Sequence, residues 1–250
     1  MMIKISIVTV VYNAVEQISS TIDSVLEQSY SNIEYIVIDG LSKDGTKDEI
    51  SRYLDNINVY ISEKDDGIYD AMNKSLDYVS GDWVLYLNAG DTLLDCFVIE
   101  KFVAEIQKME LPIAEMIGGN VMFDVHANKQ LSKVKDLSKR WVCMPACHQS
   151  LFYRVDVIRA NRFNLEFKIC SDHEQFIRLV ESGARFKPID LTVSTFQFNG
   201  VSAKNRIGLY TEKLKIAKKY NASFLNILKL QTIILRLKIS GFIKGFREIN

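Results

Sequence analysis

The chain has 250 residues, of which 48% are hydrophobic and 25% charged, so it is long enough for one large domain or two small ones. From Lys204 onward it has 11 Lys and Arg against 2 Asp and Glu, which leaves 20 against 29 in the first 203 residues. The acidic body argues against a nucleic-acid groove, whereas the basic, apolar tail favours contact with an anionic surface such as a membrane.

The four cysteines form no disulfide pattern, and the N-terminal run MMIKISIVTV is too short and too quickly polar for a signal peptide. Cytoplasmic residence with reduced thiols is therefore the expectation. The run CMPACH (143–148) offers two thiols and one imidazole but no second pair of ligands, so a zinc site is not expected there.

Strand and helix patterns alternate over the first 125 residues. The run 3–11 is almost continuously apolar, as in strands covered on both faces, and residues 15–28 carry apolar residues at helical spacing. A strand at 33–39, a helix after 43–46, a strand at 57–62, a helix at 67–79 and a strand at 82–87 follow. The alternation predicts an α/β fold with a mostly parallel, Rossmann-like sheet flanked by helices.

Beyond residue 118 the pattern is less regular. We expect a strand at 118–125, an apolar strand after Gln149, and helices near 155–160 and 172–182. From Tyr210 onward the chain is expected to be mostly helical.

Polar side chains collect where three predicted strands end, in TVVYNA (9–14), IDGLSKDGT (38–46) and LNAGD (87–91). Carboxyl ends of parallel strands meet at one edge of a sheet, where open α/β folds bind their ligands, so we expect a binding site there. The second segment lacks both the GxGxxG pattern of dinucleotide folds and the GK[ST] ending of a P-loop. The residues gathered at this edge are Thr9, Tyr12, Asn13, Asp39, Ser42, Asp44 and Asp91.

Several stretches together resemble the family 2 inverting glycosyltransferases with the GT-A fold, in that family's order. They are the opening segment 6–46, SEKDDGIYDAMNKSL (62–76), LNAGD, CHQSLFYR (147–154) and CSDHEQFIRL (170–179). The second resembles the subset that builds bacterial surface polysaccharides, such as colanic-acid and O-antigen enzymes. The resemblance spans residues 3–203 and implies a nucleotide-sugar donor, most simply a UDP-sugar.

The resemblance assigns the nucleobase to the ends of the first two strands. Thr9, Tyr12 and Asn13 are expected to cradle the base, and Asp39 to accept the uracil N–H, with a weaker assignment for Ser42. A carboxylate suits that task because it only accepts, and charge-assisted hydrogen bonds are strong. The alternative for Asp39 is a turn carboxylate that binds its own backbone.

The segment DDGIYDAMNK corresponds to the family's sugar and phosphate region. Asp65, Asp66, Asn73 and Lys74 are the candidates to contact donor hydroxyls or the diphosphate. Many relatives have Arg where this chain has Met72, so a familiar phosphate contact is absent or replaced. Lys74 is a candidate for that charge, with a solvated helix lysine as the alternative.

The LNAGD segment corresponds to a DxD-type motif that holds Mg²⁺ or Mn²⁺ against the donor diphosphate. The usual form resembles LDxDD, so Asn88 and Gly90 replace acids and Asp91 remains as the metal ligand. One carboxylate suffices in principle, because Mg²⁺ keeps waters and takes other ligands from phosphate oxygens. Asn88 is expected to assist beside the donor.

A base for the acceptor hydroxyl is the second requirement, since the hydroxyl must lose its proton as it attacks the anomeric carbon. CSDHEQFIRL aligns with the family's EDxDxxxRL segment, which assigns the base to Asp172; the alternative is the N-cap acid of the next helix. His148 and Gln149 are expected to face the acceptor. With a single carboxylate acting as base, attack is direct and the anomeric configuration inverts.

The tail from 223 to 250 carries a helical stripe of polar residues with apolar residues over much of the remainder. Its charges interrupt it too often for a transmembrane span, so a helix in the interface of an anionic membrane is expected. The alternative is a helix packed on the catalytic domain. The stripe consists of Asn226, Lys229, Thr232, Arg236, Ser240, Lys244 and Arg247.

The chain is accordingly divided into a GT-A domain at 1–203 and a basic helical region at 204–250. Within the domain, 1–125 is the nucleotide-sugar half and 126–203 the acceptor half. The expected activity is sugar transfer to a saccharide acceptor, carried on an undecaprenyl-pyrophosphate lipid, at the inner face of the cell membrane in surface polysaccharide synthesis. A catalytically impaired nucleotide-binding relative and a nucleotidyltransferase are the alternatives.

Overall fold

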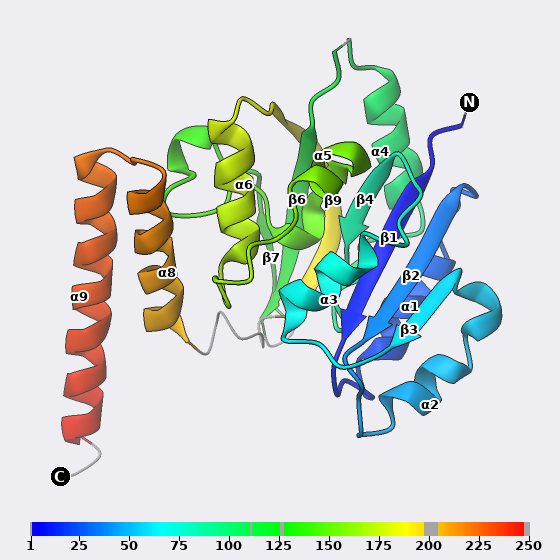
Figure 1. The fold of residues 1–250 in the computed structure, drawn as a ribbon, viewed down its shortest axis with the longest axis horizontal. Helices are drawn as coiled ribbons and strands as arrows, with labels where there is room; N and C mark the ends of the chain where they lie inside the picture. Colours follow the sequence, from blue (N-terminus) through cyan, green and yellow to red (C-terminus); the bar gives the residue numbers. More distant parts are fainter. Residues whose placement is uncertain (1, 111, 126–127, 198–204, 248–250) are drawn as a thin grey trace.

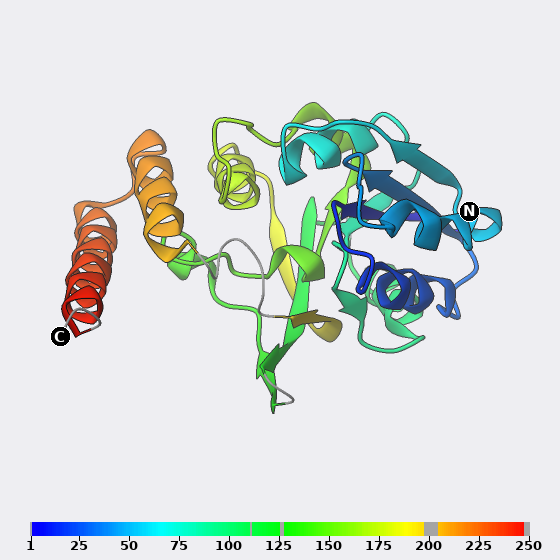
Figure 2. The ribbon, with the colours of Figure 1, turned by 90° about the horizontal axis from the view of Figure 1, so that it is seen from below.

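The computed structural model describes residues 2–110, 112–125, 128–197 and 205–247. In these residues nine strands form one mixed sheet in the order β3-β2-β1-β4-β8-β6-β9-β5, with β7 paired to β6 (Figures 1 and 2). The strands are β1 Ile5–Val11, β2 Ile33–Asp39, β3 Val59–Ser62, β4 Trp83–Tyr86, β5 Thr92–Leu93, β6 Met116–Val125, β7 Asn128–Ser132, β8 Leu151–Arg154 and β9 Phe186–Gln197. The helices are α1 Ile18–Leu26, α2 Thr46–Ser51, α3 Ile68–Ser75, α4 Val98–Gln107, α5 Val155–Ala160, α6 Ser171–Glu181, α8 Arg206–Lys219 and α9 Phe224–Arg247.

The first four strands are parallel, and their register brings the carboxyl ends together. Val11 pairs with Asp39, and Asp39 with Ser62, so β1, β2 and β3 end at one level. The chain after β4 continues along β1, because the N–H of Leu87 donates to Val8 and that of Ala89 to Val10. The LNAGD segment therefore lies beside the end of β1, as the sequence predicts.

Beyond β4 the sheet is mixed. β8 runs antiparallel to both β4 and β6, while β6 and β9 are parallel to each other. β5, which follows the LNAGD segment, pairs antiparallel with β9. β9 lies between β6 and β5 in the sheet. This long strand therefore pairs the short strand that follows the LNAGD segment with the strands of the later part of the chain.

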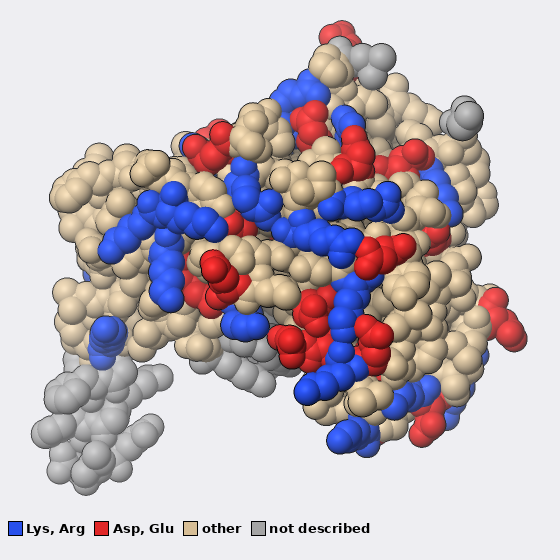
Figure 3. Space-filling model, in the orientation of Figure 1, with Lys and Arg blue, Asp and Glu red and all other residues tan. Residues whose placement is uncertain are grey.

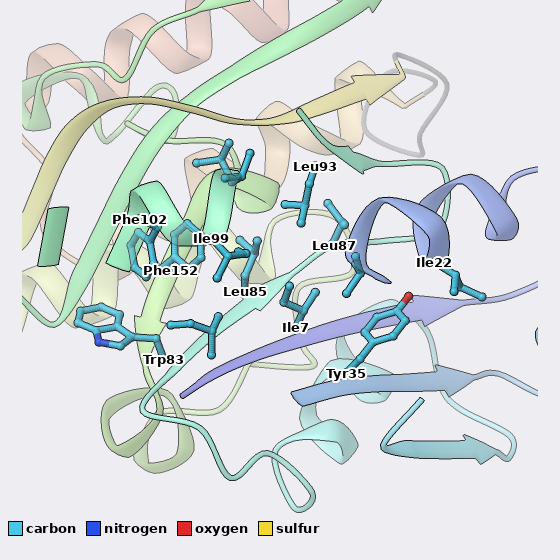
Figure 4. Close-up of a cluster of buried hydrophobic side chains, with 14 of the residues drawn as sticks. Ile7, Ile22, Tyr35, Trp83, Leu85, Leu87, Leu93, Ile99, Phe102 and Phe152 are labelled. Carbon is cyan, nitrogen blue, oxygen red and sulfur yellow. The ribbon is translucent and has the colours of Figure 1, made fainter. Parts of the chain in front are cut away.

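Each face of the sheet carries its own apolar core. On one face, α1 and α4 cover the first core, in which the ring of Phe102 stacks on Phe152 and meets Trp83 edge-on (Figure 4). On the other face, α3, α5 and α6 cover the second core. Large apolar side chains buried in this way contribute about 1.5–3 kcal/mol each, so the two cores fix the strand ends that carry the polar residues.

The tail forms two helices on the side of the molecule away from β1–β3; α8 packs against α6, and α9 packs against α8 (Figure 1). A third apolar cluster joins them to the rest of the molecule. Among the described residues, no helix is long and apolar enough to cross a membrane. The residues buried in this cluster are Trp141, Phe167, Cys170, Ile177, Ile216, Ala217, Ala222 and Leu230.

The expected α/β architecture with a helical tail is confirmed, and β2 has the predicted bounds. β1, β4 and β6 begin and end within two residues of the prediction. α4, β5, β7 and β9 are not among the elements expected from the sequence, although α4 carries its buried residues at helical spacing. The predicted boundary between residues 203 and 204 lies outside the described residues, and it stays a prediction.

Candidate active site at the carboxyl edge of the sheet

The turn after β1 is hydrogen-bonded to the turn after β2. Asn13 has a positive φ of 48°, its N–H donates to the hydroxyl of Ser42 at 2.8 Å, and its side-chain oxygen accepts from the N–H of Lys43 at 2.9 Å. Tyr12, 63% exposed, presents its ring at the surface beside this turn. Asn13 and Ser42 thus shape the edge, and Tyr12 offers it an aromatic face.

Thr9 does not reach this edge. It lies within β1 and is fully buried, and its hydroxyl is 3.0 Å from the hydroxyl of Tyr35 on β2. Burial raises the pKa of Tyr35, so both hydroxyls stay neutral and hydrogen-bond to each other. The structure thus places the hydroxyl of Thr9 inside the sheet, apart from the exposed ring of Tyr12, and its contact with a nucleobase stays a prediction.

Asp39 is a buried carboxylate at the end of β2. Both of its oxygens accept from the N–H of Ser42 at 3.2 Å, and one accepts from the hydroxyl of Ser62 at 2.6 Å. The alternative of a turn carboxylate is therefore observed. A carboxylate has about four acceptor positions, so these bonds leave capacity for one further donor.

Gly40 is the point at which the side chains of Asp65 and Tyr12 converge. A Cβ at this position would overlap the carboxylate of Asp65 and lie 3.3 Å from the ring of Tyr12. Asp65 in turn accepts from the N–H of Gly67 at 3.0 Å, immediately before α3. The glycine thus permits Asp65 and Tyr12 to approach the end of β2, while the neighbouring Asp66 is exposed.

Asn73 and Lys74 have partners within the protein. Asn73 receives the N–H of Phe163 at 2.8 Å and donates to its carbonyl at 2.9 Å, so its amide is committed to the acceptor half. Lys74 forms ion pairs with Glu63 at 2.9 Å and Asp70 at 3.6 Å, which together raise its pKa. Both side chains are therefore engaged within the protein, and Asn73 ties α3 to the segment that follows α5.

The carboxylate of Asp91 is only 5% exposed, and burial raises its pKa to about 8. The amide of Gln149 hydrogen-bonds to it and partly offsets that shift. The side-chain oxygen of Asn88 is buried without a hydrogen-bond partner. One buried carboxylate and one unpartnered amide oxygen suit a hard divalent cation, which prefers oxygen ligands.

The protein offers few ligands for a metal at this position. No group of three or more His, Cys, Asp or Glu side chains that could hold a metal occurs in the part of the chain that the structure describes. A cation here would complete its coordination with phosphate oxygens and water, as Mg²⁺ commonly does. Asn88 and Asp91 therefore fit a metal shared with a bound diphosphate, not a site closed by protein ligands.

Asp172 lies in the first turn of α6, where the helix dipole favours a negative charge. Its carboxylate accepts from the hydroxyl of Tyr69 on α3 at 2.8 Å. Burial and the charge of Asp172 both raise the pKa of Tyr69 well above its usual value, so the hydroxyl stays protonated and remains a donor. Asp172 is thus not the N-cap, and α3 holds it through Tyr69.

Tyr69 is a functional candidate that sequence reasoning missed. It stands inside the YDAMNK run, whose neighbouring Asp65, Asp66, Asn73 and Lys74 attracted the assignment. Its partner lies 103 positions away in the sequence, so only the folded arrangement reveals the contact.

His148 and Gln149 follow the loop that leads into β8. The imidazole of His148 stacks on Tyr86 with ring centroids 5.5 Å apart, and both of its ring nitrogens lack a partner. Burial lowers its pKa, against the opposing charge of Asp172, so the ring is neutral at neutral pH. Gln149 is turned to Asp91, whereas both ring nitrogens of His148 are buried without a hydrogen-bond partner.

The two halves meet at this point. The charges of Asp91 and Asp172 both act on the thiol of Cys147, whose pKa burial raises to about 11. Side-chain contacts link the surroundings of the two carboxylates. Gln149 hydrogen-bonds to Asp91, and the ring of the neighbouring His148 meets Phe163. Phe163 also packs near Tyr69, which donates to Asp172.

The tail supports the loop that precedes Asp172. The carboxylate of Glu212 on α8 accepts from three successive backbone N–H groups, those of residues 168, 169 and 170, at 3.0, 3.0 and 2.9 Å. Glu174, buried on α6, receives Lys219 at 3.1 Å and Arg178 at 3.3 Å. Charge-assisted bonds of this kind are strong, so α8 fixes the start of α6.

Known proteins resemble this chain in sequence. Residues 6–161 match the family described as Glycosyl transferase family 2. The PGL/p-HBAD biosynthesis glycosyltransferase of Mycobacterium bovis is 26% identical over 203 residues, which cover 79% of this chain and 78% of that protein. The putative teichuronic acid biosynthesis glycosyltransferase TuaG of Bacillus subtilis is 37% identical over 90 residues, 35% of this chain and 36% of TuaG.

Solved structures resemble it in fold. S. aureus TarS 1–349 in complex with UDP-GlcNAc superposes with a TM-score of 0.71 at 17% identity, covering 92% of this chain and 70% of TarS. The mannosyltransferase PcManGT from Pyrobaculum calidifontis, in complex with GDP-Man and Mn²⁺, gives a TM-score of 0.69 at 15% identity, over 94% of this chain and 70% of PcManGT.

Proposed function

The chain belongs to glycosyl transferase family 2 and has a GT-A fold, and we propose that it transfers a sugar from a UDP-sugar to a hydroxyl of a saccharide acceptor, with inversion. The observation that carries this proposal is the row of contacts between two carboxylates. Gln149 hydrogen-bonds to Asp91, Tyr69 donates to Asp172, and Phe163 packs between the rings of His148 and Tyr69. Asp91 is buried as a metal ligand is, and Asp172 stands in a helix N-terminal turn.

The donor base is assigned to the surface around Gly40. Tyr12 supplies an exposed ring for stacking, and Asp39 retains capacity to accept the N–H of uracil. Asp65 lies against the same glycine and is assigned to the ribose, while Asp66 is exposed before α3. A Gly40→Ala substitution would push Asp65 away, which makes the glycine part of this site.

Asn88 and Asp91 are the residues that would hold Mg²⁺ or Mn²⁺ with the donor diphosphate. The cation supplies positive charge that stabilises the leaving UDP. Gln149 keeps the carboxylate of Asp91 oriented. PcManGT, which has a related fold, is seen with both GDP-Man and Mn²⁺.

Asp172 is proposed as the general base. An acceptor hydroxyl that hydrogen-bonds to it loses its proton to the carboxylate as the oxygen bonds to the anomeric carbon. Tyr69 holds that carboxylate in place, and the neutral imidazole of His148 is available to bind a second hydroxyl of the acceptor. With no second carboxylate assigned as nucleophile, one displacement inverts an α-linked donor to a β-glycoside.

The acceptor is proposed to be a lipid-linked saccharide in surface glycan synthesis, approached from the membrane side. Outward-facing residues on α9 form an exposed apolar stripe at helical spacing, with Leu225 74% exposed, opposite the face that buries Leu230. Lys229 and Arg236 flank the stripe, and basic side chains gather over α8 and α9 (Figure 3). The stripe, called the outer stripe below, consists of Leu225, Leu228, Leu235 and Ile239.

The structure of α9 has features of both helices considered for the tail, the membrane-interface helix and the packed helix. One face of α9 packs on α8, as in the alternative, while the outer stripe stays uncovered in the described chain. An amphipathic helix with an apolar face and flanking basic residues binds the interface of an anionic bilayer. We assign the outer stripe to that role; the side chains of Lys244 and Arg247 lie outside the described ones.

A screen of nucleotide sugars with three readouts tests the proposed reaction. A transferase releases UDP only when an acceptor is present, and the product carries the transferred sugar. UDP binding without release at any acceptor would favour the impaired relative, and release of pyrophosphate would favour a nucleotidyltransferase.

A further inference from the structure

Leu41 has a backbone conformation that leucine rarely adopts. Its φ is 64°, in the left-handed region, where the Cβ of any residue other than glycine comes too close to a backbone carbonyl oxygen. Among the described residues, Asn13 and Asn221 are the other two non-glycine residues with a positive φ. Asparagine tolerates this region, whereas a bulky side chain there is an outlier. Leu41 is therefore the most strained of the three.

Hydrogen bonds on both sides of Leu41 hold the strained turn. Before it, the N–H of Gly40 donates to the carbonyl of the last residue of β1 at 2.9 Å. After it, the N–H of Ser42 donates to the carboxylate of Asp39 at 3.2 Å, and the hydroxyl of Ser42 accepts from the N–H of Asn13 at 2.8 Å. The turn is fixed by its surroundings, which is the condition under which backbone strain persists.

Packing inside the protein does not account for a leucine at this position. Its side chain is 40% exposed and, within the described part of the chain, belongs to none of the three apolar clusters. The exposed ring of Tyr12 lies nearby, because a Cβ at Gly40, the residue before Leu41, would be 3.3 Å from it. Strained residues of this kind gather at ligand-binding sites, so the exposed leucine marks a contact with a ligand.

We propose that Leu41 packs against the nucleobase of the donor, together with Tyr12. The inference rests on the proposed function and adds a specificity-determining residue to its donor site. The two faces of the base are the extended apolar surface of a nucleotide sugar, whereas its ribose, diphosphate and sugar are covered with polar groups. Contact with an exposed leucine removes apolar area from water. It therefore favours a donor that carries a base over a sugar phosphate that lacks one.

The strain has a role in this binding. The rigid turn holds the side chain of Leu41 at the edge of the sheet before the donor arrives, and a preorganised contact loses less conformational freedom on binding. The free energy of the strained backbone is thus spent on the folded chain and improves donor affinity. Folding stability and donor affinity are accordingly expected to respond in different directions when Leu41 is replaced.

A glycine substitution separates the two quantities. Leu41→Gly removes the side chain and relieves the strain, since glycine adopts a positive φ freely. Calorimetry measures UDP binding in the presence of Mg²⁺, and competition with UDP measures the binding of uridine. We expect the affinity for both probes to fall by the same factor, at least about fivefold, because the apolar contact is lost. The melting temperature should stay at or above the parental value.

Two further variants serve as controls. Leu41→Met keeps an apolar side chain at the same position and should retain most of the affinity for UDP and uridine. Asn221→Gly introduces glycine at another positive φ, in the turn between α8 and α9, and should bind both probes as the parent does.

The inference is overturned if Leu41→Gly binds both probes like the parent, or if it lowers the melting temperature together with the affinity. It is also overturned if uridine does not compete with UDP in the parent, or if the variant weakens UDP alone, because a contact with the base acts without the diphosphate. A parent that binds no UDP would instead contradict the proposed function, and the inference would fall with it.

Discussion

Asp91 shows how a binding site is maintained at a cost in stability. Burial raises its pKa from 3.8 in the reference state to about 8 in the folded chain. Between these values the unfolded chain has lost a proton that the folded chain retains, so folding stability falls as the pH rises from about 4 to about 8. Above that range the buried charge imposes its full penalty.

Asp91→Asn should therefore stabilise the metal-free protein in a pH-dependent manner. In EDTA at pH 8.5 we expect the variant to melt at least about 2 °C above the parent, with the difference shrinking toward pH 5. Asp65→Asn, at a less buried position, serves as the control. Equal differences in melting temperature at both pH values would show that the ionisation of Asp91 carries no such penalty.

Tyr69 is predicted to act through Asp172. Tyr69→Phe keeps the ring, which packs near Phe163, but removes the hydroxyl that donates to the base. Because a hydrogen bond to a charged group contributes about 1.5–3 kcal/mol, we expect kcat to fall about tenfold or more. UDP affinity and the donor KM should stay at parental values.

Steady-state kinetics and calorimetry test whether the loss is confined to kcat and leaves UDP affinity unchanged. A parental kcat would remove Tyr69 from the positioning role. An equal loss of kcat and UDP affinity would indicate general damage to α3.

At the residue scale, the sequence predicts where a side chain lies better than it predicts the hydrogen-bond partner of that side chain. The edge on which Tyr12, Asp39 and Asp91 lie follows from the strand pattern, because parallel strands end together. The hydrogen bonds of Thr9 to Tyr35 and of Asn73 to Phe163 join residues 26 and 90 positions apart. Such contacts depend on packing that no local spacing encodes.

At the scale of elements, α8 emerges as part of the catalytic body. Glu212 binds the backbone of residues 168–170, and Glu174 on α6 binds Lys219. The sequence shows only a basic helical tail, because the acids that fasten it are few among many lysines. The apolar residues of α8 and α9 are divided between an inner, buried face and the outer stripe. The helical spacing of apolar residues in the sequence does not distinguish these two faces.

Glu212→Ala should lower both stability and transfer. It leaves three backbone N–H groups before α6 without their acceptor, and removing an acceptor from partly buried donors costs about 1–3 kcal/mol. We expect a melting temperature lower by several degrees and a reduced kcat, with UDP affinity retained. Lys215→Ala on the same helix is the control. A variant with parental melting temperature and kcat would show that α8 does not fix the base.

At the scale of the whole molecule, α9 lies at the end of the molecule farthest from β1–β3 (Figures 1 and 2), and the side chains of the outer stripe are exposed on it. Replacing Leu228 and Leu235 together with Glu should abolish cosedimentation with anionic vesicles and leave UDP binding unchanged, because neither side chain belongs to the buried cluster. High salt should weaken the association of the parent.

The matched control carries Glu at two exposed leucines elsewhere, Leu54 and Leu131. It should cosediment as the parent does. If the α9 variant and the parent sediment equally, the outer stripe is not the membrane contact.

The two halves of the fold meet at Asp172, and its replacement tests the central claim most directly. Asp172→Asn keeps the size of the side chain and an acceptor for Tyr69, but an amide takes up no proton at neutral pH. UDP release with acceptor should fall at least about 10²-fold, the effect typical of a general base, while calorimetry shows unchanged UDP affinity. Near-parental transfer by this variant would contradict the account.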